Sequence, residues 1–145
     1  GKEHVGKRQR TQGKEYDKKM PFFFLNLDIP PAPLMKDEIE YNIIPQIPLY
    51  TLLNKYNGVK EHYVATAKEF RTYKITRLPK YLILSLKRFS KNMFFIEKNP
   101  TIANFPIKNL ELKEYVDTTL YKGVTKYKLI ANIMHHGAPG KKELT

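Results

Sequence analysis

Two adjacent histidines, His135 and His136, are the side chains of this 145-residue chain best suited to acid–base chemistry. A hydrolase that uses such a base also needs an activated nucleophile. The sequence has no cysteine, and its serines, Ser85 and Ser90, lie outside any nucleophile-elbow pattern. We therefore interpret Ser85 as a packed strand residue and the histidines as structural hydrogen-bonding groups. The sequence predicts no catalytic residue in this chain.

Metal and cofactor sites also lack the residues that they need. The other histidines, His4 and His62, are distant in the sequence, and adjacent residues such as His135 and His136 point to opposite faces of a strand. The absence of cysteine excludes thiolate ligands. No glycine-rich loop is followed by Lys-Ser or Lys-Thr, as a phosphate-binding loop requires. The sequence therefore predicts neither a metal nor a cofactor.

The strongest charge signal lies between positions 71 and 91, where there are seven cationic side chains and no acidic one. The whole chain has a formal net charge of +12, which favours binding to nucleic acid or to acidic proteins. Tyr73, Tyr81 and Phe89 interleave with the cations; they could stack on bases, although aromatic residues on strands more often fill a core. We treat the run as a candidate interaction patch whose partner is either protein or RNA. Its members are Arg71, Lys74, Arg77, Lys80, Lys87, Arg88 and Lys91.

The element that must position this patch is the segment 81–86 in the stretch LPKYLILSLKRF. It is apolar except for Ser85 and is too short for a typical helix, which predicts a strand covered on both faces in a central sheet. On that interpretation, replacing Leu84 or Leu86 by alanine should cost about 2 to 5 kcal/mol.

The remaining pattern predicts several further strands and one helix. Aromatic and β-branched residues predict strands over 21–29, within 63–76, and over 93–99, the last paired as a hairpin with the 81–86 strand. Leucines at helical spacing between Pro48 and Gly58 predict a short helix. Residues 109–116 fit a helical turn or a short strand, and alternation predicts a strand over 127–134. The expected fold class is α+β, mainly antiparallel β.

The domain organisation is expected to be simple. Residues 1–20 are rich in charge and glycine, which predicts a basic flexible lead-in or loop. Residues 21–145 are expected to form a single partial domain, truncated at its C-terminus because the chain ends in a polar loop just after a strand. No apolar run approaches the roughly 18 residues that would span a bilayer, so no membrane partner is predicted.

Two motifs resemble those of a known family. Leu78-Pro79 followed by YLILSLKRF is similar to the palm motif of the ubiquitin-specific proteases, in which a Leu-Pro pair leads a strand that ends in a basic residue, Arg and Phe. The segment YKLIANIMHHG resembles the family's later motif, Tyr-x-Leu-x-Ala-x-x-x-His-x-Gly. The phrases LDIPPAPLMKDE, IIPQIPLYTLLNKYNG and FSKNMFFIEKNPTIANFP resemble the spliceosomal, Sad-type branch of the family. The resemblance covers about residues 21–137.

The resemblance implies the fingers and palm portion of a papain-like ubiquitin-specific protease fold. The family's catalytic cysteine and general-base histidine have no counterpart here, because His135 matches an earlier, noncatalytic position of the family pattern. The cysteine pairs that hold zinc in the fingers of many members are also absent. The resemblance thus implies a noncatalytic, nuclear splicing protein whose partners are tri-snRNP proteins, with ubiquitin or a ubiquitin-like protein as a further candidate partner.

Two alternatives stay open at this point. The chain could be a palm fragment of an active thiol deubiquitinase whose catalytic cysteine and histidine lie outside it. It could also be a basic module that contacts RNA through the candidate interaction patch.

Overall fold

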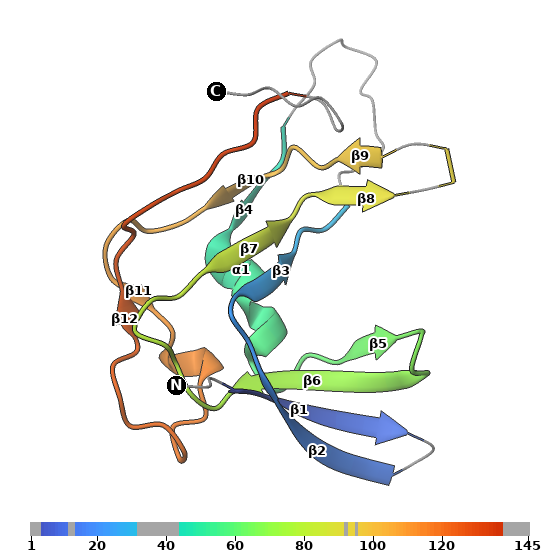
Figure 1. Ribbon diagram of the computed structural model, residues 1–145, viewed down its shortest axis with the longest axis vertical. Coiled ribbons are helices and arrows are strands. Elements are labelled where there is room, and N and C mark those ends of the chain that lie inside the picture. The colour runs from blue at the N-terminus through green and yellow to red at the C-terminus, as the bar shows by residue number, and fades with distance from the viewer. Residues whose placement is uncertain (1–3, 12–13, 32–43, 92, 95, 138–145) are drawn as a thin grey trace.

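The computed structural model describes residues 4–11, 14–31, 44–91, 93–94 and 96–137. A four-stranded sheet lies at one end of the molecule, a short helix lies near the middle, and two-stranded pairs surround that helix (Figure 1). The polar loop expected at the end of the chain falls mostly outside the described residues. No helix in the described ranges has the length and apolar character needed to cross a membrane.

The four-stranded sheet has the order β2-β1-β6-β5 and is antiparallel throughout. Its strands are β1 (His4–Thr11), β2 (Lys14–Pro21), β5 (His62–Val64) and β6 (Glu69–Ile75). The expectation of a flexible lead-in over residues 1–20 is wrong for β1 and β2. These strands are charged and contain little that a core could bury, but β1 forms a ladder with β2 on one side and with β6 on the other. Hydrogen bonds between the backbones of neighbouring strands hold this segment in place, and the apolar content of a sequence does not predict such bonds.

The predicted helix is present as α1 (Leu49–Leu53), which continues into the 3-10 turn η1 (Asn54–Tyr56). Pro48 precedes the first turn with a φ of −64°, a position where its missing N–H costs nothing. The buried leucines of α1 recur at helical spacing and form one face of the helix that packs on the core, as the sequence predicted. The chain then leaves through Gly58 with a φ of +79°, which glycine adopts without strain.

Two of the described strand pairs are parallel, whereas the other described pairs of strands are antiparallel. The strand β3 (Leu25–Asp28) pairs with β7 (Leu84–Lys87), and β4 (Gln46–Pro48) pairs with β10 (Ile102–Asn104). The expectation that residues 81–86 form a strand in a central sheet, covered on both faces, is wrong. The strand begins only at Leu84 and belongs to a two-stranded sheet, and its side chains are partly buried except for the exposed Lys87.

Antiparallel pairs complete the fold, so the prediction of a mainly antiparallel α+β structure is confirmed. The strand predicted over 93–99 is present as β9 (Ile96–Lys98), but its predicted hairpin with the 81–86 strand is wrong, because β9 pairs with β8 (Phe89–Lys91) and β7 pairs with β3. Residues 109–116 contain both alternatives: β11 (Leu110–Glu111) and the 3-10 turn η2 (Lys113–Tyr115).

The strand predicted over 127–134 is wrong in length. Only β12 (Lys126–Tyr127) pairs with β11, and residues 128–137 are exposed, with Ile133 98% accessible. A segment with an alternating pattern forms a strand only when another segment of backbone pairs with it. Beyond β12, the described backbone makes one such contact, in which Leu129 N–H donates to the Ile107 carbonyl oxygen at 2.8 Å.

The core lies between α1 and the surrounding strands. Leu27, Leu53, Ile75 and Leu112 are fully buried, and they come from β3, α1, β6 and the segment after β11. Leu84 and Leu86 of β7 pack against this core only from its edge. Apolar burial therefore joins segments that are far apart in the sequence around one short helix.

Candidate interaction surface

The residues considered for catalysis come from different segments, and no hydrogen bond between a serine and His135 is present among the described residues. Ser85 is on β7 and Ser90 on β8, whereas His135 packs edge-on against Phe89 at 5.3 Å between ring centroids. Lys98 Nζ donates to the carbonyl oxygen of His135 at 2.8 Å and lies 3.3 Å from its Nδ1. His135 thus contacts the β8–β9 hairpin. Among the described residues, no three His, Asp or Glu side chains gather where they could hold a metal ion.

The candidate interaction patch is divided by the fold. Arg71 forms an ion pair with the buried Glu69, at 2.5 Å from Nη2 to Oε1, and Tyr16 donates to the other oxygen of that carboxylate at 2.7 Å. Lys74 Nζ donates to the carbonyl oxygens of Glu114 at 2.8 Å and Asn57 at 3.3 Å. Both cations therefore bind groups of the protein itself.

Arg88 is also held by the protein. Its Nη1 donates to the carbonyl oxygens of Thr101 at 2.5 Å and Asn99 at 3.2 Å, and its own carbonyl accepts from Asn99 N–H at 2.6 Å. The other four cations are exposed. They are Arg77, Lys80, Lys87 and Lys91. Because β6 and β8 lie at opposite ends of the molecule (Figure 1), the structure does not bring the seven residues together on one surface.

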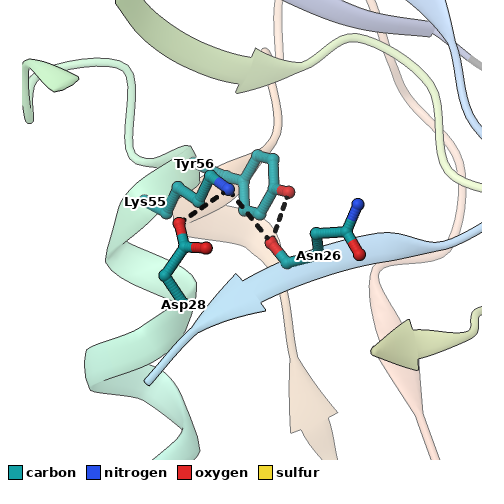
Figure 2. A network of polar contacts seen from close by, with 4 residues as sticks. All are labelled: Asn26, Asp28, Lys55 and Tyr56. Atoms are coloured by element: carbon teal, nitrogen blue, oxygen red, sulfur yellow. Dashed lines mark hydrogen bonds and ion pairs between the residues drawn. The ribbon is translucent and has the colours of Figure 1, made fainter. Parts of the chain in front are cut away.

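A polar network joins η1 to β3 (Figure 2). Tyr56 Oη donates to the Asn26 carbonyl oxygen at 2.8 Å, and Lys55 Nζ forms an ion pair with Asp28 Oδ2 at 2.9 Å. Lys55 also donates to the Asn26 carbonyl at 3.4 Å. Burial, with the nearby Asp28 charge, raises the pKa of Tyr56 well above its usual range, so the phenol remains a donor. The network fixes the position of β3 relative to the helix.

Exposed apolar residues that the sequence analysis missed lie in the segments just before β3 and β7. Leu25 N–H donates to the Ile83 carbonyl oxygen at 2.9 Å, which places Phe24 beside Ile83 where the two segments meet. Phe23 and Tyr81, which are near these two residues in the sequence, are exposed as well, Phe23 by 90%, and we call the four residues the apolar patch. The available signal was the alternation within 81–86: Leu82, Leu84 and Leu86 pack on the core, so the intervening positions face outward.

We expect the Tyr56 phenol to stabilise this arrangement measurably. Tyr56→Phe keeps the buried ring but removes the donor to the Asn26 carbonyl, so the free energy of unfolding should fall by about 1 kcal/mol. Tyr63→Phe is the matched control, since the Tyr63 ring is largely exposed. Chemical denaturation of both variants tests the assignment, and equal effects would contradict it.

A second prediction concerns pH and His62. Burial, together with the positive charges of Lys60 and Lys55, lowers the pKa of His62 below its ordinary 6.5. The imidazole of His62 therefore binds a proton more readily in the unfolded protein than in the folded protein. As the pH falls from about 6.5 through the lower pKa of the folded state, protonation of His62 favours unfolding and the free energy of unfolding decreases. His62→Phe keeps a ring against Tyr73, whose centroid lies 5.8 Å away, and removes the proton. Denaturation curves between about pH 7 and pH 5 should show a shallower pH dependence for the variant; identical slopes would refute this role.

The chain can now be compared with known proteins. A family model described as "Ubiquitin carboxyl-terminal hydrolase" matches residues 5–143. That match includes β1, the core and the segment beyond β12. This chain belongs to the ubiquitin carboxyl-terminal hydrolase family.

Individual relatives of this family member are similar along most of its length. The human "Ubiquitin carboxyl-terminal hydrolase 39" is 48% identical over 143 residues, which are 93% of this chain and 25% of the relative. The "Probable mRNA-splicing protein ubp10" of Schizosaccharomyces pombe is 40% identical over 128 residues, 86% of this chain and 25% of the relative. The chain thus spans a quarter of the length of the curated relatives that it matches.

Solved structures show the same fold. The SAGA Ubp8/Sgf11/Sus1/Sgf73 DUB module bound to ubiquitin aldehyde matches 81% of this family member with a TM-score of 0.53 at 22% identity, over 25% of that chain. The Ubp8-Sgf11-Sgf73-Sus1 SAGA DUB module matches 79% with a TM-score of 0.56 at 22% identity, over 24% of that chain. The prediction of a partial ubiquitin-specific protease fold is confirmed.

Proposed function

We propose that this chain is a noncatalytic part of a nuclear splicing protein, where it acts in pre-mRNA splicing through protein contacts with the tri-snRNP. The observation that carries the proposal is the 40% identity, along 86% of the chain, to a relative named for mRNA splicing. The absence of cysteine supports the noncatalytic part, because the family's nucleophile is a thiolate and this chain has none to supply.

The apolar patch supports a role in protein contact. Exposed aromatic and aliphatic side chains that gather on one surface mark sites of association, and large aromatic residues contribute most to such interfaces. The patch sits on a rigid support, because Figure 2's network holds β3 on η1 and the Leu25–Ile83 backbone bond fixes the two segments. We propose that this patch is where a tri-snRNP protein binds.

A binding experiment tests the patch. In the full-length protein, the double substitution Phe24→Ser and Ile83→Ser should weaken co-sedimentation with the tri-snRNP by about tenfold, as expected when anchor residues are truncated. Val59→Ser with Val124→Ser is the control, because both valines are exposed and lie outside the patch. An unchanged association of the patch variant, with its thermal melting preserved, would contradict this assignment.

The alternative function is an active thiol deubiquitinase in which another part of the protein supplies cysteine and histidine. The family that matches this chain is described as a hydrolase, which favours keeping an active deubiquitinase as the second candidate. The full-length protein is incubated with a ubiquitin probe that carries a cysteine-reactive C-terminal group, and intact mass is measured. We expect no adduct under conditions where an active control enzyme is fully labelled, whereas one adduct at a single cysteine would establish the alternative and overturn the noncatalytic proposal.

A further inference from the structure

A hollow lined by lysines lies beside the β11–β12 pair, at β12 and the residues just before β11. It has a volume of about 300 Å³, and we call it the lysine groove. Its lining residues are Lys108, Asn109, Lys126, Tyr127 and Lys128. In Figure 1 these strands lie on the opposite side of the molecule from the β8–β9 hairpin.

The two walls of the lysine groove are fixed by backbone contacts. Leu110 pairs with Tyr127 and Glu111 with Lys126 across the ladder, and Leu129 N–H donates to the Ile107 carbonyl oxygen at 2.8 Å. Asn109, with a φ of +58°, bends the chain between Ile107 and Leu110. Lys108 therefore approaches from one wall while Lys126 and Lys128 approach from the other.

The floor of the lysine groove is also held in place. Tyr127 packs against the core, and its hydroxyl donates to the carbonyl oxygen of Pro79. Lys80 follows Pro79 directly, is exposed, and extends the positive surface beyond the groove. The cations are thus presented by a prearranged surface, which lowers the cost of ordering them on binding.

No acidic side chain lines the groove. Glu111, which faces Lys126 across the ladder, accepts from Thr125 Oγ1 at 2.5 Å and from Lys113 N–H at 2.9 Å. Among the residues that the structure describes, the ammonium groups of Lys108 and Lys128 have no hydrogen bond or ion pair, whereas those of Lys74 and Lys98 bind carbonyl oxygens. Lys126 also interacts with the Glu111 charge, whereas Lys108 and Lys128 have no acid among the lining residues, so an anion bound between them is stabilised.

We propose that the lysine groove binds the sugar-phosphate backbone of a nucleic acid, without reading its sequence. The lysine ammonium group is a compact positive charge that binds phosphate. Binding to the phosphate backbone requires several such charges along a surface and does not require contacts with the bases. A protein interface would need an apolar centre, and lysine is depleted from such centres, whereas the lining here contains no aliphatic residue. This assignment places nucleic-acid contact at residues other than the 71–91 run and is independent of the tri-snRNP protein contact.

The test uses the full-length protein and fluorescence anisotropy with labelled oligouridine and oligothymidine single strands. The triple variant Lys108→Gln, Lys126→Gln, Lys128→Gln should bind at least about tenfold more weakly near 100 mM salt, and the slope of log affinity against log salt should fall by about 2. The matched control Lys60→Gln, Lys87→Gln, Lys91→Gln removes the same charge from exposed positions elsewhere and should change affinity less than about twofold.

Arginine at the same positions keeps the charge, so the triple Lys→Arg variant should retain binding, and thermal melting of every variant should be unchanged. The proposal is overturned if the wild-type protein does not bind, if the groove and control variants lose affinity equally, or if the arginine variant binds as weakly as the glutamine one. It is also overturned if a polyglutamate peptide binds the groove and the oligonucleotides do not. None of these results bears on the tri-snRNP association, which depends on the apolar patch.

Discussion

Replacing Leu53 by alanine is expected to lower the free energy of unfolding by about 2 to 5 kcal/mol. The Leu53 side chain is fully buried at the centre of the core, on the inward stripe of α1. Alanine is the better helix former, so the loss has to come from the vacated volume and the lost apolar contact and not from the helix itself. Urea denaturation with fluorescence or circular dichroism detection measures the change.

Two further leucines sharpen this prediction. Leu120→Ala is the control, since Leu120 is exposed and should change stability by less than about 0.5 kcal/mol. Leu86→Ala should fall between the two, because Leu86 packs against the core from its edge and is only partly buried. If Leu86→Ala proved as costly as Leu53→Ala, the core would be centred on β7 and its placement around α1 would be wrong.

Arg88→Gln is expected to cost about 2 to 3 kcal/mol, although Arg88 belongs to a run that the sequence marks as an interaction patch. The substitution removes a charged donor from two carbonyl oxygens, and Thr101, which supplies one of them, is almost fully buried. A buried acceptor that loses its partner costs more than the hydrogen bond itself. The amide of Asn99, which donates to the Arg88 carbonyl, should exchange with solvent faster in the variant.

The neighbouring residue provides the comparison for Arg88. Lys87→Gln removes the same charge from an exposed position one residue earlier and should leave the denaturation midpoint almost unchanged. A loss of stability shared equally by the two variants would show that net charge, and not the contacts of Arg88 with Asn99 and Thr101, is responsible.

Local signals in the sequence were sufficient for the elements whose formation depends on near neighbours. The leucine spacing after Pro48 and the exit at Gly58 predicted α1, and the residue pattern over 93–99 predicted the strand β9 but not its partner β8. In both cases the interactions that matter lie within a few turns or across one short loop. The family motifs added the overall fold, which the comparisons confirm.

The apolar pattern alone was a poor guide where a distant partner was required. The charged strand β1 forms because β6, more than fifty residues later, pairs with it, whereas the alternating segment after Tyr127 has almost no such partner among the described residues. A strand obtains its hydrogen bonds from another segment of backbone, so its own sequence states only that it is able to pair.

By itself, the sequence determined the composition of this protein: no thiol, a strong positive charge, family motifs and a chain able to form a mainly antiparallel fold. Only the tertiary structure decided which charges are available. It binds Arg71, Lys74 and Arg88 to acceptors within the protein, and it brings Lys108 beside Lys126 and Lys128 from the other side of a ladder. The physical reason is that a cation's partner is set by distance in space, and folding creates acceptors near some cations and leaves others facing water.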